Sequence, residues 1–374
     1  MIYITLSQNS LGHHVFKLVL GFFKYITYYF ILYVSHAWKT QNDQPELLHF
    51  GKTPEFKRVL FTNDRKERFE SEIPNPCVSV ESVPFPKTGP PAYTYINAPI
   101  STTMRIALKV GYIGTNYHGF QIQPCVNTIE GELFASLKKL DLIKNPHEAN
   151  YIASGRTDKG VHALGQVIAF DTPVPEIAIP RAINSNLPGT IWTWAQAHVP
   201  DDFDPRRHAK SRKYMYIMPG KLDNSLLNSA SKLIMGEHDF LNFITPEKDR
   251  ISSTFVYKLN TSTVGEFTIM DISADHFLWH MVRKIATALK MIGSGKRDIP
   301  WLEKMLLPSL FREALPPAPA HGLVLKNVEY GNIDWKEDPY AKKKTSEILT
   351  EEFLWHGVMA QMLNELKKDM TPDN

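Results

Sequence analysis

The sequence predicts a mixed α+β (α/β) protein with a mainly antiparallel sheet flanked by helices. Strand-like and helix-like runs are interspersed along the chain, and several strand-like runs follow one another directly, which is typical of antiparallel sheets. The 374 residues are 43% apolar and 22% charged, enough to bury a substantial core. No short internal repeat is visible, so a solenoid is not favoured.

The first hundred residues differ from the rest. Residues 1–42 lack acids, and two apolar runs at 15–23 and 25–34 are separated by Lys24. Neither reaches the roughly 20 residues of a membrane span, so a membrane or secretory role is disfavoured but stays an alternative. Residues 38–103 are polar and rich in proline. We expect residues 1–103 to be an extension that is disordered, or that precedes a natural start at Met104.

The first organised half spans residues 104–218. Residues 105–113 alternate between apolar and polar, which predicts a half-buried strand. Asn127 and Glu130 have the spacing of a capping box at the start of a helix. Further elements are expected as strands at 166–170, 191–199 and 211–218 and as a helix at 175–187.

The second half spans residues 219–333. Its clearest element is a helix at 277–292, where apolar residues recur every three or four positions until Gly293. Further elements are expected as helices at 224–235 and 300–307 and as strands at 251–259, 266–273 and 323–330. Residues 334–374 form a charged tail that is expected to be helical around 351–368.

Residues 154–163 read SGRTDKGVHA and place Asp158 in a turn just before a buried strand. Gly155 and Gly160 allow the backbone to turn tightly and approach a ligand. Arg156 and Lys159 supply opposite charge, which favours an ionised carboxylate. The alternative is an ordinary surface turn.

Five bases fall within residues 206–213, ahead of Tyr214 and Tyr216. On a strand, Arg212, Tyr214 and Tyr216 would share one face. A guanidinium beside aromatic rings suits phosphate contact and base stacking. A solvated basic edge strand is the alternative.

Arg283 lies near the edge of the apolar stripe of the helix at 277–292. A partly buried arginine usually has an acid or a phosphate as its partner. The alternative is that its guanidinium extends to water.

The sequence calls for no cofactor and no metal. Cys77 and Cys125 are its two cysteines, so Cys-x2-Cys spacing does not occur. Phosphate-binding and dinucleotide-binding glycine motifs are also missing. The net charge of +3 is too small to indicate nucleic acid by itself, so a polyanion site must come from local clustering.

The GRTDKGVHA loop, RKYMY at 212–216 and HMVR at 280–283 resemble, in this order, the TruA family of tRNA pseudouridine synthases. Residues 112–123 are also similar to family sequence, and the resemblance covers about residues 104–331. It implies two ferredoxin-like halves in one mainly antiparallel sheet. It also implies that Asp158 is the catalytic nucleophile.

The resemblance further implies substrate-binding roles for Arg156, Tyr214 and Arg283. Arg156 would orient the aspartate or displace the target base, Tyr214 would stack on the flipped base, and Arg283 would pair with Asp158. The implied enzyme is a cytoplasmic homodimer that isomerises uridine in tRNA at positions 38, 39 or 40, without a cofactor. A non-catalytic RNA-binding protein on the same fold is the alternative.

Overall fold

The first half of the chain follows the order strand–helix–strand–strand–helix–strand. This computed structural model describes residues 103–247 and 251–370. The elements of the first half are β1 (Met104–Tyr112), α2 (Ile129–Lys139), β2 (Ile152–Ala153), β3 (His162–Thr172), α3 (Pro180–Asn184) and β4 (Ile191–His198). Strands β4, β1, β3 and β2 lie side by side in that order, each antiparallel to its neighbour. Strand β1 shares one core with Ile129, Leu133 and Leu137 of α2.

The second half repeats this order with one extra strand, β6, and one extra helix, α6. Its elements are β5 (Ser211–Pro219), α4 (Asn224–Ile234), β6 (Gly236–Asp239), β7 (Ser253–Val264), β8 (Phe267–Ala274), α5 (Met281–Gly293), α6 (Ile299–Met305) and β9 (Leu323–Glu329). Strands β9, β5, β8 and β7 are neighbours in that order, and β6 is added beyond β7. Helix α5 buries the predicted stripe, including Ile285, Leu289 and Ile292. Each such side chain contributes about 1.5–3 kcal/mol of burial free energy.

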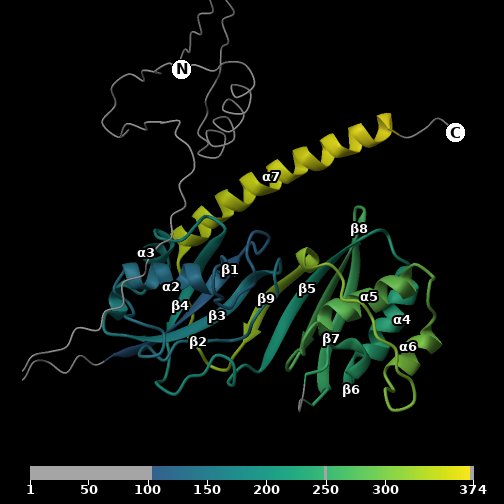
Figure 1. The fold of residues 1–374 in the computed structure, drawn as a ribbon, viewed down its shortest axis with the longest axis horizontal. Coiled ribbons are helices and arrows are strands. Elements are labelled where there is room, and N and C mark those ends of the chain that lie inside the picture. The colour runs from purple at the N-terminus through teal and green to yellow at the C-terminus, as the bar shows by residue number, and fades with distance from the viewer. Residues whose placement is uncertain (1–102, 248–250, 371–374) are drawn as a thin grey trace, which may run out of the picture. The chain divides into compact units, whose positions relative to one another are not determined.

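Both halves are therefore βαββαβ units of ferredoxin-like type with the same strand order. This confirms the predicted mixed α/β class and the mainly antiparallel sheet. Figure 1 shows α2 and α3 beside the strands of the first half, and α4, α5 and α6 beside those of the second.

A parallel pair, β3 with β9, joins the halves into one sheet, with His162 opposite Val324. Strand β9 supplies Leu323 to the core of the second half, and Leu325 and Val328 to that of the first. Glycine at 165 permits this contact, because a Cβ there would lie 2.5 Å from the Lys326 carbonyl oxygen.

Several boundaries differ from the sequence-based expectation. Helix α2 is capped by Thr128, whose side chain accepts from the Gly131 amide, while Glu130 accepts from the Ile122 amide instead. The capping box at Asn127 and Glu130 was therefore wrong. The helix expected at 175–187 is a 3-10 turn followed by α3, both begun by a proline. Helix α5 starts at Met281 rather than at residue 277, because His280 adopts a left-handed conformation with φ of 64°.

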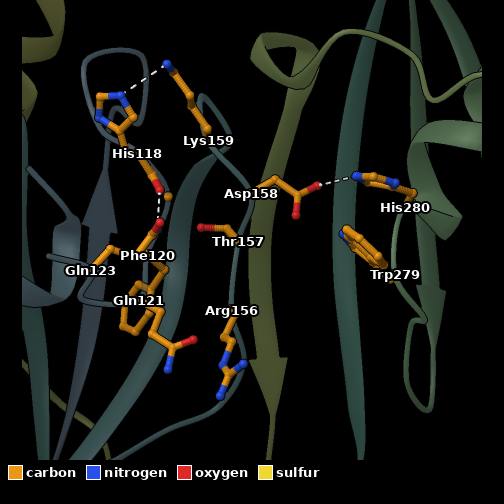
Figure 2. Close-up of a pocket in the computed structure, with 11 residues that line it drawn as sticks. His118, Phe120, Gln121, Gln123, Arg156, Thr157, Asp158, Lys159, Trp279 and His280 are labelled. Atoms are coloured by element: carbon orange, nitrogen blue, oxygen red, sulfur yellow. Dashed lines mark hydrogen bonds and ion pairs between the residues drawn. The ribbon is translucent and has the colours of Figure 1, made fainter. Parts of the chain in front are cut away.

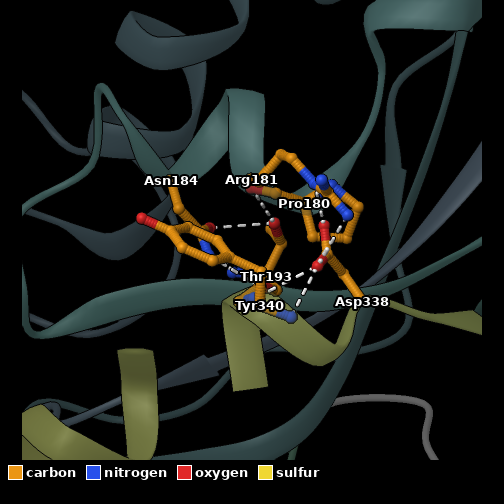
Figure 3. A network of polar contacts seen from close by, with 7 residues as sticks. Pro180, Arg181, Asn184, Thr193, Asp338 and Tyr340 are labelled. Carbon is orange, nitrogen blue, oxygen red and sulfur yellow. Dashed lines mark hydrogen bonds and ion pairs between the residues drawn. The ribbon is translucent and has the colours of Figure 1, made fainter. Parts of the chain in front are cut away.

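The tail contains more structure than the sequence indicated. A two-residue strand, β10 (Lys336–Glu337), pairs with β4, and α7 (Pro339–Asp369) follows. Asp338 caps α7 by accepting from the Tyr340 and Ala341 amides, and it also forms an ion pair with Arg181 of α3 at 2.9 Å. Figure 3 shows this network at the base of α7.

The apolar runs at 15–23 and 25–34, and the expected extension up to residue 102, lie outside the described residues. Within residues 103–247 and 251–370, no helix has the length and apolar content needed to cross a membrane.

Candidate active site

The loop that carries Asp158 is fixed by contacts on either side of it. The Thr157 hydroxyl is buried and lies 2.8 Å from the Tyr112 hydroxyl of β1. Gly160 has φ of 80°, which lets the Val161 amide turn back and donate to the Asp158 carbonyl at 3.1 Å. The Asp158 side chain is thereby presented outward and is 34% exposed.

Arg283 of α5 is the cation next to this carboxylate. Its Nη1 lies 2.9 Å from Asp158 Oδ2, and its Nε donates to the Ala318 carbonyl at 2.6 Å. Two acceptors therefore hold one guanidinium, and its side chain is only 14% exposed. The alternative in which Arg283 extends to water does not describe this structure.

His280 is a second neighbour of Asp158 that sequence reasoning missed. Its Nε2 lies 3.3 Å from Asp158 Oδ2, and its Nδ1 lies 2.9 Å from the Thr245 hydroxyl. Burial lowers the pKa of His280; Asp158 opposes this effect, and Arg283 and Lys284 add to it. A neutral imidazole must carry its proton on Nε2 to donate to a carboxylate, so Nδ1 accepts from Thr245.

Arg283 and His280 both contact the same oxygen of the Asp158 carboxylate. Arg283 and His280 approach Oδ2, whereas no hydrogen bond from the described part of the chain reaches Asp158 Oδ1. Figure 2 shows Asp158 between the pocket-lining loop of the first half and His280 of the second.

A pocket of about 340 Å³ opens beside Asp158. Both halves line it, with residues 118–121 and 123 and 156–159 from the first half and Trp279 and His280 from the second. Arg156 is exposed at this pocket. Burial raises the pKa of Glu130, and the positive charge of Arg156 partly offsets this rise. Lys159 points to His118 at 3.2 Å, so the structure pairs Asp158 with Arg283 rather than with its sequence neighbours.

Tyr214 on β5 packs edge-on against Phe277, with ring centroids 5.1 Å apart. Burial raises its pKa to about 12, and the nearby Asp158 charge adds to this effect while Arg212 opposes it. The ring is therefore a neutral phenol in the vicinity of the carboxylate.

The basic stretch is not a uniform phosphate-binding face. Arg212 donates to the carbonyls of Ser154, Arg206 and Asp275, so its guanidinium ties together three backbone segments around the site. Tyr216 is buried and donates its hydroxyl to the Pro319 carbonyl. The interpretation that Tyr216 stacks on a base was wrong, because its ring is buried. Arg206 and Lys213 are exposed.

Within the described residues, no three His, Cys, Asp or Glu side chains are placed together so that they could hold a metal ion.

Comparison with known proteins agrees with this fold. The sequence model of the family described as tRNA pseudouridine synthase matches residues 109–206 and 230–331. A protein named tRNA pseudouridine synthase A from Methanosarcina mazei is 52% identical over 265 residues, covering 70% of this chain and 98% of that protein. The proteins of that name from Methanococcoides burtonii and Archaeoglobus fulgidus are 51% and 39% identical, covering 70% of this chain and 96% and 97% of those proteins.

The family model and these relatives thus define an enzyme of the isomerase class, here built on two ferredoxin-like halves. The chain belongs to the tRNA pseudouridine synthase family.

Proposed function

We propose that this chain isomerises uridine to pseudouridine in the anticodon stem-loop of tRNA, at positions 38, 39 or 40, with Asp158 as the nucleophile. The observation that carries the proposal is the Asp158 carboxylate, which two donors hold by Oδ2 while Oδ1 remains open beside a pocket. A carboxylate fixed in this way needs little reorganisation before it reacts.

The reaction breaks the N1–C1′ bond of uridine and forms a C5–C1′ bond. The proton on C5 leaves and N1 gains one, so atoms and electrons balance without a redox partner or added water. An ionised Asp158 can attack the sugar or the base, or it can remove the C2′ proton. All three routes begin with the same oxygen, Oδ1, directed toward the nucleoside.

His280 and Arg283 act as positioning residues in this proposal. Together they fix the rotamer of Asp158, Arg283 by a charged hydrogen bond and His280 by a neutral N–H. The hydrogen bond between the Thr245 hydroxyl and His280 Nδ1 orients the imidazole from a residue that does not line the pocket.

The target base must leave its stack to reach Asp158. Unstacking takes a few kcal/mol, and stacking on an aromatic ring returns about 1–3 kcal/mol. We assign that stacking role to Tyr214, and we assign displacement of the base to the exposed Arg156. Lys159 at the pocket rim provides positive charge for backbone phosphates.

Pseudouridine mapping on tRNA tests the proposal. Transcripts with uridine at position 38, 39 or 40 are incubated with the protein, and tritium release from 5-tritiated uridine is followed in parallel. We expect product at one or more of these positions and at no other uridine. Binding without product would instead support the RNA-binding alternative.

The same proposal includes a homodimer that grips one tRNA, working in the cytoplasm. Fractionation of cells that produce the full chain tests the location, and recovery with membranes would contradict it. Salt should weaken tRNA binding steeply, because phosphate contacts release counterions. A flat salt response would contradict phosphate gripping.

A further inference from the structure

Trp279 is a large aromatic side chain that the fold leaves uncovered at the pocket beside Asp158. The two residues before it, Phe277 and Leu278, pack against the core of the second half, whereas Trp279 is 47% exposed. Its indole is nevertheless part of the pocket lining. Of the Phe, Tyr and Trp side chains that line this pocket in the described residues, only Trp279 has an accessible ring, because Phe120 is buried.

The position of this indole is fixed relative to the carboxylate. The rings of Trp279 and His280 have centroids 4.8 Å apart and planes inclined by 31°, and His280 Nε2 lies 3.3 Å from Asp158 Oδ2. The Trp279 carbonyl accepts from the Thr245 amide at 3.0 Å, which holds the backbone. Figure 2 shows Trp279 beside His280, across the pocket from the loop that carries Arg156 and Asp158. A ring held in this way needs little ordering when a ligand binds.

The pocket has room for one nucleotide but not for its neighbours in the strand. Its volume is about 340 Å³, near the lower end of the range of about 300–1,000 Å³ for ligand pockets. The nucleotides on either side of a flipped uridine must therefore stay at the rim. Each of them loses a stacking partner when the target base leaves the stack. An exposed aromatic ring at the rim can replace that partner, because every base has a face that stacks on an aromatic side chain.

We propose that Trp279 stacks on the nucleobase directly next to the target uridine, as a second aromatic platform besides Tyr214. The proposal rests on the proposed function, because it concerns the same stem-loop, and it names how the site accepts different neighbours. Positions 38, 39 and 40 differ in their neighbouring nucleotides, and stacking is tolerant of base identity. One indole therefore serves all three positions, whereas hydrogen bonds to base edges would select a particular neighbour.

A double-mutant cycle between protein and RNA tests the contact. Trp279→Leu removes the ring, and an abasic nucleotide on the 5′ or the 3′ side of the target removes the neighbouring base. On the side that stacks, each change alone should lower kcat/KM by about 5–100-fold, and both together should cost no more than either one. Additive losses on both sides would overturn the proposal, because a ring that merely supports His280 does not depend on the neighbouring base. Unchanged kcat/KM for Trp279→Leu would overturn it as well.

Two further variants control the cycle. Trp279→Phe keeps an aromatic ring and should retain most of the wild-type kcat/KM. Trp355→Leu is the matched control, because Trp355 is 64% exposed on α7 and does not line the pocket. It should behave as wild type with intact and with abasic RNA. A Trp279→Phe protein as impaired as Trp279→Leu, or a Trp355→Leu protein with the same loss, would contradict a stacking role for the indole.

Photochemical cross-linking scores the same contact without turnover. The full chain is irradiated with stem-loop RNA that carries 5-iodocytidine on the 5′ or the 3′ side of the target, and the linked residue is identified by mass spectrometry. We expect one of the two RNAs to link to Trp279. Cross-links that reach other residues but not Trp279 would overturn the proposal. A link to Trp279 without any pseudouridine in intact RNA would support the stacking and contradict the proposed function, and RNA that is neither bound nor linked would overturn both.

Discussion

Asp158 and Arg283 are 125 residues apart in the sequence, yet Arg283 Nη1 lies 2.9 Å from Asp158 Oδ2. Asp158 belongs to the loop before β3, and Arg283 to the first turn of α5. Each half of the sheet supplies one member of the pair. The carboxylate therefore acquires its charged partner only when the two halves have docked.

Asp158→Asn should abolish pseudouridine formation while leaving the fold and tRNA binding intact. The amide is nearly isosteric, but it supplies neither a nucleophilic oxygen nor a base, so we expect the rate to fall by about 10²–10⁴-fold or more. Tritium release and circular dichroism measure the two effects. Asp141→Asn is the control, because Asp141 is exposed and asparagine tolerates its φ of 53°. Activity of Asp158→Asn close to wild type would end the assignment.

Arg283→Gln should lower kcat/KM by about 10–100-fold, since hydrogen bonds to charged groups contribute about 1.5–3 kcal/mol. Arg283→Lys keeps the charge but cannot bond Ala318 and Asp158 in the same planar geometry, so we expect an intermediate effect. Arg297→Lys, which alters an arginine paired with Glu313, is the matched control. Equal activity of all three variants would contradict a positioning role.

His280→Asn should alter the pH profile as well as the rate, and asparagine suits the left-handed backbone at this position. The pKa of His280 is lowered chiefly by burial, so the neutral form predominates at and above the ordinary histidine range. Below that range a second proton arrives on Nδ1, which then no longer accepts from Thr245.

The stability contributed by neutral His280 is accordingly present above its ordinary pKa and is lost as the pH falls toward the lowered value. We expect kcat/KM of wild type to decline in this acidic window, and that part of the decline to be missing in His280→Asn. An identical acid limb in both proteins would show that His280 does not govern it.

Tyr214→Phe should retain most activity, whereas Tyr214→Leu should lose more, because stacking needs the ring and not the hydroxyl. The pKa of about 12 keeps the phenol neutral well beyond its ordinary value of about 10. The stabilisation by this neutral phenol is full below pH 10 and is lost as the pH rises toward 12. Thermal melting across that window should fall less steeply for Tyr214→Phe than for wild type. Greater activity of Tyr214→Leu than Tyr214→Phe would contradict stacking.

The sequence identified long periodic elements and the family, but not the geometry of the site. The stripe in α5 was visible because burial dictates one face of the helix. The alternation in β1 located the strand, but the prediction that it is half-buried was wrong, because seven of its nine residues are buried. The strands β2, β6 and β10 have two, four and two residues, too short for a period to emerge. His280 was hidden within an apolar run, although its position three residues before Arg283 was the available signal.

The internal use of Arg212 and Tyr216 also had no signal in the sequence. Three of these contacts reach backbone carbonyls that lie 58, 63 and 103 positions away in the sequence. Every residue type carries a backbone carbonyl, so the residue type of the partner gives no signal. Such contacts follow from tertiary structure alone.

Gly165→Ala should destabilise the protein by about 2–3 kcal/mol, since its Cβ would lie 2.5 Å from the Lys326 carbonyl oxygen at the β3–β9 junction. Gly357→Ala in α7 meets no atom within 4 Å and should be neutral or slightly stabilising. Urea denaturation of both variants measures the difference. Equal stability would show that the junction relaxes to accept a methyl group.

The position of β9 also constrains how the protein emerges from the ribosome. Strand β9 occupies the gap between β3 and β5, yet its residues are among the last of the sheet to be translated. Until Leu323–Glu329 has left the exit tunnel, β3 and β5 each keep an open inner edge, the kind of edge that recruits foreign strands. Nascent chains truncated before β9 should therefore depend on chaperones, and catalytic competence should arise late and abruptly during synthesis.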